Sequence, residues 1–512
     1  MYFPNKTAWL FTALLLCNLV HAQTIKEFPR NVNLVEMTAP GVVIVGTDDA
    51  LYGLDKDGNE LWRNEKLKKV EAERVQVLSG SELIFVDDKG LLGKNRVLNV
   101  LDGRMYGNPD WSVGFGARVL HATNQLWILK EPNEIAVWDI ETNKLLYDLE
   151  INASYGLATG KTTSAFTGMQ PVTYTGANTA ILSLGLAHLG EYDLTTGKPK
   201  WMFNWKPYKV KKPGNGKGDI PSTPSRGFSI MKVDDATQAL YFPFRDILIA
   251  IDMKTGAAKW DPKANKTGKI QDMYVIDEGI LILTPKGVSL VDKTTGAEKW
   301  DKPIKIKGAD ASILYNDNGI FYSISKGSIV KINLAARTAE ALTDKIKFKG
   351  GESLGNMEIF GDVMVMSSSN NVVGINKNSG EILYAVYYKP PGPSLATIAG
   401  NMALAGVAMA STLNSQKLAI QNGNKYYYQY TPRMLANRGS ATSNSGNIMY
   451  ISTKFNDGDA KGFGVARIDK KTGKTTAKIV VGSREPVYSV NEQTGMIFFK
   501  SGKDKVESKA IK

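Results

Sequence analysis

A nine-residue pattern recurs along this chain and limits the folds that the chain can adopt. Three segments end at Trp201, Trp260 and Trp300, and each of them reads Asp-x-x-Thr-Gly-x-x-x-Trp. Weaker copies keep the step of four residues from glycine to an aromatic residue, or only the turn before it. The reference position of the pattern, usually glycine, falls at residues 58, 103, 143, 197, 256, 296, 337, 380, 423 and 473.

The spacing of these positions predicts a β-propeller. Neighbouring copies are 40 to 59 residues apart, which is the length of one propeller blade. Apolar, β-branched runs such as residues 41–46, 280–283 and 363–366 precede the copies, and a second short run, such as residues 249–252, then leads into the copy. No amphipathic stretch of helical period lies between them. The fold class that we predict is therefore all-β, a propeller of four-stranded blades.

The blade count is expected to be eight or more. Ten copies of the pattern are followed by a further strand pair at residues 496–499 and 505–511. We expect a single closed ring in which the segment 25–30 near the N-terminus completes the last repeat, because closure removes exposed strand edges. Two smaller propellers in tandem are the alternative.

The residues of the pattern are suited to forming a tight turn and to packing between sheets. Aspartate and threonine side chains can accept local backbone N–H groups, and glycine can adopt the positive φ of a tight turn. The aromatic residue falls on the next strand, where it can fill the gap between neighbouring sheets. We therefore expect a docking role for the residues of the three complete copies, which are Asp193, Thr196, Gly197, Trp201, Asp252, Thr255, Gly256, Trp260, Asp292, Thr295, Gly296 and Trp300.

The repeated Asp-x-x-Thr-Gly-x-x-x-Trp pattern resembles the docking motif of the pyrroloquinoline quinone (quinoprotein) β-propellers and their non-catalytic relatives. Enzymes of that family have adjacent disulfide-bonded cysteines and a calcium or lanthanide ion held by Glu, Asn and Asp. No residue here matches those sites, so no catalytic, cofactor-binding or metal residue is predicted. The resemblance instead implies the non-catalytic branch, similar to the propeller lipoprotein of outer-membrane assembly.

The first 22 residues have the features of a secretory signal peptide. Lys6 is their only charge, residues 8–16 are apolar, and Ala22 is a small residue before Gln23. The single cysteine, Cys17, lies in this segment, and bulky Leu16 before it disfavours lipid attachment. We expect a periplasmic or secreted propeller of residues 23–512, without disulfides and without a transmembrane segment.

Two insertions lengthen the repeat and are candidate partner loops. The net charge is +13, and the first insertion concentrates cations among prolines and glycines; its candidate partner residues are Lys206, Lys209, Lys211, Lys212, Lys217 and Arg226. Such a loop fits an anionic partner, and a solvated linker is the alternative. The second insertion is 431–446. The segment 426–430 places three tyrosines on one strand face, which suits inter-blade packing or a ligand platform.

Three function hypotheses follow. The leading hypothesis is an exported, non-catalytic propeller that binds envelope or extracellular proteins as a scaffold. The second is a secreted carbohydrate-binding propeller. The third is a dehydrogenase that uses pyrroloquinoline quinone with calcium, the only hypothesis that requires a cofactor. The lysines form no clustered stripe, so no nucleic-acid partner is expected. Residues 351–355 fit a Gly-x-Ser-x-Gly pattern, but the mature histidines, His121 and His188, precede them, so it predicts no nucleophile.

Overall fold

The computed structural model describes residues 24–511 apart from 39, 79–80, 87–95, 108–115, 132–133, 151–172, 185–187, 204–230, 245–246, 262–266, 269, 307–313, 326, 353, 355, 391–441, 457–460, 484–485 and 493. Within these residues every regular element other than a few 3-10 turns is a β-strand, and the strands form ten antiparallel sheets. The 3-10 turns are η1 (Ala72–Arg74), η3 (His121–Thr123) and η7 (Lys349–Gly351).

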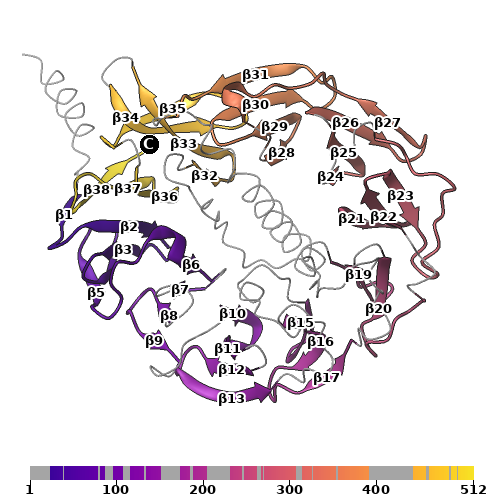
Figure 1. Ribbon diagram of the computed structural model, residues 1–512, viewed down its shortest axis with the longest axis horizontal. Coiled ribbons are helices and arrows are strands. Elements are labelled where there is room, and N and C mark those ends of the chain that lie inside the picture. Colours follow the sequence, from indigo (N-terminus) through magenta and orange to yellow (C-terminus); the bar gives the residue numbers. More distant parts are fainter. Residues whose placement is uncertain are drawn as a thin grey trace, which may run out of the picture.

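The ten sheets follow one another around a ring, as Figure 1 shows, so the propeller prediction is confirmed. We number the sheets as blades in chain order, and in each the first strand lies nearest the centre. Blades 1 to 5 consist of β2 (Val32–Met37), β3 (Val43–Thr47), β4 (Leu51–Leu54) and β5 (Glu60–Asn64); β6 (Val75–Val77), β7 (Leu83–Val86), β8 (Arg96–Asn99) and β9 (Met105–Tyr106); β10 (Gly116–Leu120), β11 (Gln125–Glu131), β12 (Glu134–Asp139) and β13 (Lys144–Glu150); β14 (Thr173–Gly176), β15 (Thr179–Leu184), β16 (His188–Asp193) and β17 (Pro199–Met202); and β18 (Lys232–Asp234), β19 (Ala239–Phe244) and β20 (Ile247–Asp252).

Blades 6 to 9 continue in the same order, and blade 10 is built from both ends of the described chain. These blades consist of β21 (Asp272–Ile276), β22 (Gly279–Thr284) and β23 (Gly287–Val291); β24 (Leu314–Asp317), β25 (Ile320–Ser325), β26 (Ser328–Asn333) and β27 (Thr338–Ala341); β28 (Asn356–Phe360), β29 (Val363–Ser367), β30 (Asn371–Asn376) and β31 (Ile382–Tyr387); β32 (Thr442–Ser445), β33 (Ile448–Phe455), β34 (Gly462–Asp469) and β35 (Thr475–Val480); and β36 (Tyr488–Asn491), β37 (Met496–Lys500) and β38 (Lys505–Ala510) with β1 (Thr24–Glu27).

The ring closes as the sequence predicts. Strand β1 pairs antiparallel with β38, with Thr24 opposite Ser508 and Glu27 opposite Lys505. The next residues continue the contact, because the Phe28 N–H donates to the Asp504 carbonyl at 2.9 Å. The segment that precedes blade 1 is therefore the outermost strand of blade 10, and the alternative of two separate rings is wrong.

The hydrophobic core is divided into one cluster between each pair of neighbouring blades, all the way around the ring. Strand β22 shows the reason. Ile280 and Ile282 face blade 5, while Leu281 and Leu283 face blade 7. Successive side chains of a strand point to opposite faces, so a strand buried on both sides is apolar at every position. This explains the continuous apolar runs in the sequence.

Eight of the sheets have the predicted four strands, and the other two, blades 5 and 6, have three. In both, isolated bridges replace the fourth strand, such as Ile251 with Ala258 and Val291 with Glu298. Nine copies of the repeated pattern supply the turn that follows the third strand in blades 1 to 9. The tenth copy, at Gly423, lies outside the described residues.

Candidate functional site

The three complete copies of the repeated pattern form turns of the same geometry. In blade 4 the Asp193 carboxylate accepts the N–H groups of Thr195 and Thr196 at 2.8 and 3.0 Å. These backbone N–H groups, that of Thr196 foremost, hold the pKa of Asp193 below its usual value. Gly197 has a φ of +71° and donates its N–H to the Asp193 carbonyl at 2.7 Å. Asp252 and Asp292 accept the equivalent bonds in blades 5 and 6.

The aromatic residue of each copy docks on the turn of the following blade. Trp201 of blade 4 is 8% exposed and lies against Gly256 of blade 5, where an added Cβ would approach the indole to 2.5 Å. Its Nε1–H donates to the Met253 carbonyl at 3.0 Å. Glycine at position 256 thus serves two needs, a φ of +71° and space for the neighbouring ring.

This contact recurs around the ring with the same acceptor position. In each case the polar atom of the aromatic side chain donates to the carbonyl one residue after the Asp or Asn that begins the next turn. The pairs are Trp62 with Val100, Tyr106 with Ile140, Tyr147 with Leu194, Trp201 with Met253 and Tyr384 with Lys470. Sequence reasoning identified the turns and four of these aromatic residues, but not Tyr106, which lies three residues after Gly103, and not the carbonyls that join the blades.

Trp260 and Trp300 vary this arrangement. The Trp260 ring contacts the Gly296 turn of blade 6, yet it is only partly buried, and its Nε1–H donates back to Leu248 of its own blade at 3.3 Å. That blade lacks a regular fourth strand, so the indole covers part of the edge of β20. Trp300 is 6% exposed and packs beneath Arg337, whose guanidinium lies 5.5 Å from the ring centre at the position that glycine has elsewhere.

Ion pairs between blades are a feature that the sequence analysis missed. The residue after the motif Asp or Asn is lysine in blades 6, 8 and 9, and it pairs with an acidic residue of the preceding blade. The pairs are Lys293 with Asp234 at 3.3 Å, Lys377 with Asp317 at 2.7 Å and Lys470 with Glu358 at 2.7 Å. The signal was present as a lysine at one fixed position of the repeat.

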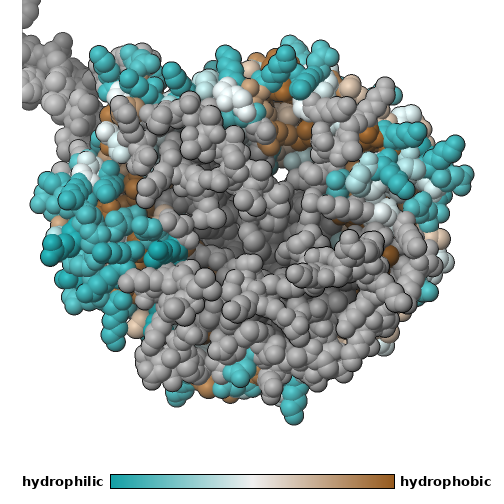
Figure 2. Space-filling view, viewed as in Figure 1, coloured by the Kyte–Doolittle hydropathy of each residue, from teal (hydrophilic) through white to brown (hydrophobic). Residues whose placement is uncertain are grey.

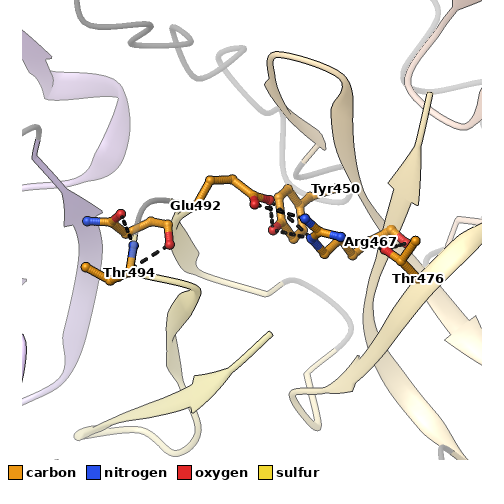
Figure 3. Close-up of polar contacts among 6 residues, drawn as sticks. Tyr450, Arg467, Thr476, Glu492 and Thr494 are labelled. Atoms are coloured by element: carbon orange, nitrogen blue, oxygen red, sulfur yellow. Dashed lines mark hydrogen bonds and ion pairs between the residues drawn. The ribbon is translucent and has the colours of Figure 1, made fainter. Parts of the chain in front are cut away.

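A polar cluster joins blade 9 to blade 10 (Figure 3). Arg467 of β34 donates to Glu492 at 3.0 Å, to the Tyr450 hydroxyl at 3.2 Å and to Thr476 at 2.8 Å, and Tyr450 also bonds Glu492. Burial and the Glu492 carboxylate raise the pKa of Tyr450, and the Glu492 contact raises that of Arg467. Both groups therefore stay protonated and neither can act as a base, and the bonds to Glu492 fasten blade 9 to blade 10.

A second polar cluster lies at the hairpin between β29 and β30. One carboxylate oxygen of Glu352 accepts bonds from the Ser368 hydroxyl, the Asn370 N–H at 3.0 Å and the Asn371 amide at 2.8 Å. Glu352 belongs to the Gly-x-Ser-x-Gly segment, whose Ser353 lies outside the described residues. The glutamate thus orders this hairpin, which is a structural role.

The candidate partner loops fall outside the described part of the chain. This holds for Lys206, Lys209, Lys211, Lys212, Lys217 and Arg226, for the tyrosines of 426–430, and for residues 431–441 of the second insertion. Among the residues that the structure describes, no group of three His, Cys, Asp or Glu side chains could hold a metal ion. No described helix is long and apolar enough to cross a membrane.

The rim of the ring exposes large apolar side chains. We define the rim strands as the fourth strands of the four-stranded blades, including β1 of blade 10. Five of the exposed side chains lie on rim strands and two in or next to turns; they are Leu61, Leu145, Leu146, Ile382 and Leu383, and Leu101 and Ile320. Large exposed apolar groups are a feature of protein interaction sites.

The chain has low sequence identity to the solved structures that it matches. No family model and no curated protein matches it. Solved structures that match include BamB from Moraxella catarrhalis, with 14% identity, 71% of this chain and 98% of that chain covered, and a TM-score of 0.34. The dihydro-heme d1 dehydrogenase NirN in complex with DHE matches with 11% identity, 91% and 76% coverage, and a TM-score of 0.36. The C-terminal WD40 domain of Sif2 matches with 10% identity, 67% and 95% coverage, and a TM-score of 0.32. At these values the likeness assigns no activity and no partner.

Proposed function

We propose that this chain is an exported, non-catalytic propeller of the quinoprotein-like class that binds envelope or extracellular proteins as a scaffold. The observation that carries the proposal is the exposure of Leu145 and Leu146 on β13 and of Ile382 and Leu383 on β31, all on the rim. Adjacent exposed aliphatic pairs have a solvation cost that contact with another protein removes. The polar residues of the repeated turns, in contrast, are used within the ring.

The export part of the proposal rests on residues 1–22. An apolar run followed by a small residue at Ala22 is the pattern that signal peptidase recognises. We expect the mature protein to begin at Gln23, outside the cytoplasm, one residue before β1 begins. N-terminal sequencing of the protein from its native compartment tests this. A mature product that retains Cys17, with or without a lipid, would contradict it.

The binding part is tested by changing the rim while leaving the ring intact. The double variant Leu145→Ser with Leu146→Ser removes the exposed aliphatic pair of β13, and we expect it to reduce recovery of cross-linked envelope proteins about tenfold or more. Quantitative mass spectrometry of proteins cross-linked to the purified, tagged chain measures the recovery. Glu340→Gln on rim strand β27 is the matched control and should leave recovery unchanged.

One further arm of that experiment separates the two contact surfaces. Replacing Lys209, Lys211 and Lys212 with serine tests the cationic insertion, which would contribute a salt-sensitive contact with an anionic partner. Unchanged recovery with this variant would identify the insertion as a solvated linker. If both the lysine variant and the leucine variant recover partners like the parent, the scaffold proposal fails.

A further inference from the structure

Two neighbouring connections between blades share a lysine-rich sequence. Blade 6 is joined to blade 7 through Asp-Lys-Pro-Ile-Lys-Ile-Lys-Gly at residues 301–308, and blade 7 is joined to blade 8 through Asp-Lys-Ile-Lys-Phe-Lys-Gly at residues 344–350. The hairpins between the second and third strands of the same two blades also contain Lys-Gly, at 286–287 and 326–327. Together these four segments contain eight lysines and no arginine.

Each connection lies along the hairpin of the blade that it leaves. Ile304 forms an antiparallel bridge with Val288 of blade 6, with N–H to carbonyl distances of 2.8 and 3.0 Å. In blade 7 the Ile346 N–H donates to the Gly327 carbonyl at 3.0 Å. In a four-stranded antiparallel sheet this hairpin and the end of the last strand lie at the same end of the blade. Both connections therefore lie on the face of the ring opposite the repeated turns, and we call it the hairpin face.

The lysines project from the hairpin face, and the apolar residues between them point into the ring. Ile304 and Ile306 belong to the core cluster between blades 6 and 7, and Ile346 and Phe348 to the cluster between blades 7 and 8. Because side chains alternate in an extended segment, the lysines of 345–349 share one direction and are about 7 Å apart. Six of the eight lysines belong to the described residues and all six are exposed; these hairpin-face lysines are Lys286, Lys302, Lys305, Lys345, Lys347 and Lys349.

The hairpin-face lysines are not used within the described part of the ring. None of them forms an ion pair or donates its ammonium group to another residue there, and the exposed acidic residues of the two connections are only Asp301 and Asp344. Near the repeated turns, in contrast, Lys293 and Lys377 pair with acidic residues of the preceding blade. Figure 2 shows hydrophilic side chains over the part of the ring where Figure 1 draws β22, β23, β26 and β27.

We propose that the hairpin-face lysines bind a segment of a partner protein that is rich in aspartate and glutamate. Such a segment has the complementary charge. Its alternate side chains are also about 7 Å apart when it is extended, which matches the spacing of Lys345, Lys347 and Lys349. This inference rests on the proposed scaffold function, since it names the chemistry of one partner.

The composition of the surface favours a carboxylate-rich chain over other polyanions. Phosphate groups and nucleic acids are typically bound by arginine and by exposed aromatic rings. These segments have no arginine, and their single aromatic residue, Phe348, is half-buried. A peripheral contact with a bilayer would use apolar side chains beside the cations, but here those side chains point into the ring. The shared sequence is also confined to two neighbouring connections.

Fluorescence anisotropy of a labelled peptide of about ten Asp and Glu residues, which spans about 33 Å when extended, tests the proposal on the purified chain. We expect a Kd of about 0.1 mM or lower at low ionic strength, and a loss of about tenfold or more at about 0.5 M salt. Lys305→Glu with Lys347→Glu reverses one charge in each connection and should raise Kd about tenfold. Lys305→Gln with Lys347→Gln removes the charges without reversing them and should raise it less.

Two matched variants control for net charge and for position. Lys254→Glu with Lys474→Glu changes the net charge equally but lies at the repeated turns, where both lysines are exposed. Lys66→Glu with Lys68→Glu lies on the hairpin face between blades 1 and 2, across the ring in Figure 1. Both variants should bind the peptide like the parent, and a peptide of Asn and Gln should not bind the parent. Circular dichroism checks that every variant is folded.

Absence of peptide binding at low ionic strength would overturn the proposal, as would binding that the Lys305 and Lys347 variants leave unchanged. Cosedimentation with vesicles of phosphatidylcholine and phosphatidylglycerol is the second arm. Vesicle binding without peptide binding, weakened equally by reversal at Lys66 and Lys68, would overturn it in favour of a flat bilayer surface. The peptide measurement needs no envelope protein, so its failure is distinct from unchanged cross-linking by the leucine variant of β13, which bears on the scaffold function.

Discussion

Truncating Trp201 to alanine is expected to lower the free energy of unfolding by about 3 to 5 kcal/mol, the usual cost of removing a buried tryptophan. The indole fills the space between blades 4 and 5 among Ile181, Leu240 and Phe242. Its removal also leaves the Met253 carbonyl without its donor, which is an additional cost for a buried polar group. Urea unfolding followed by tryptophan fluorescence and circular dichroism measures the change.

Two comparison variants show whether docking between blades is the cause. Trp201→Phe keeps most of the ring and loses only the Nε1–H donor, so its loss should be smaller. Trp260→Ala should also cost less than Trp201→Ala, because Trp260 is partly exposed and bonds its own blade. If Trp201→Ala unfolds at the same urea concentration as the parent, the docking role of the repeated aromatic residue is wrong.

The repeat period made the fold predictable, because each turn and its aromatic residue are local in sequence. The Asp-x-x-Thr-Gly segment determines its own turn through backbone bonds to Asp193, Asp252 or Asp292. The partner of each aromatic residue was not predictable in the same way. It lies in another blade, 52 residues away for Trp201 and Met253, and only the ring geometry brings the two together.

Variations between blades were harder to predict. The sequence of blade 5 contains a complete motif copy, yet its fourth strand is replaced by a bridge and by the indole of Trp260. The ion pair of Lys470 with Glu358 joins residues 112 positions apart, so a lysine that looked like one of many solvating charges is fully buried. Such pairings depend on which blades are neighbours.

The exposure of the rim side chains could not be predicted from the sequence, because rim strands and buried strands are similarly apolar. Strand β22 and strand β31 are both apolar at nearly every position, but β22 is buried throughout, whereas β31 exposes Ile382 and Leu383. Hydrophobicity alone cannot separate an inner strand from a rim strand when both lie between blades. The position of the strand within the blade decides the exposure, and position follows from the strand order.

Closure of the ring by β1 leads to the second large effect that we expect. Removing residues 24–30 deletes the strand that pairs with β38 and takes away Phe28, which is 5% exposed and lies edge-on to Tyr52 at 5.1 Å. Loss of a buried phenylalanine alone costs about 3 to 5 kcal/mol, and the deletion also uncovers the backbone edge of β38. We expect a loss of about 5 kcal/mol or more, with aggregation on refolding.

Deletion of residues 24–30 can weaken the contact between blades 10 and 1 only if the ring is closed. In a closed ring blade 10 is the contact between the last and first parts of the chain, so its opening exposes the cluster that Val35, Val45 and Phe498 share. Thermal unfolding and light scattering of the shortened chain measure both effects. Glu27→Gln is the matched control, because it removes only the exposed pair with Lys505 and should leave the melting temperature unchanged. A shortened chain that has the melting temperature of the parent and stays monomeric would contradict this prediction. It would show that blade 10 is stable without β1, and that the bond from the Phe28 N–H to the Asp504 carbonyl does not stabilise the ring.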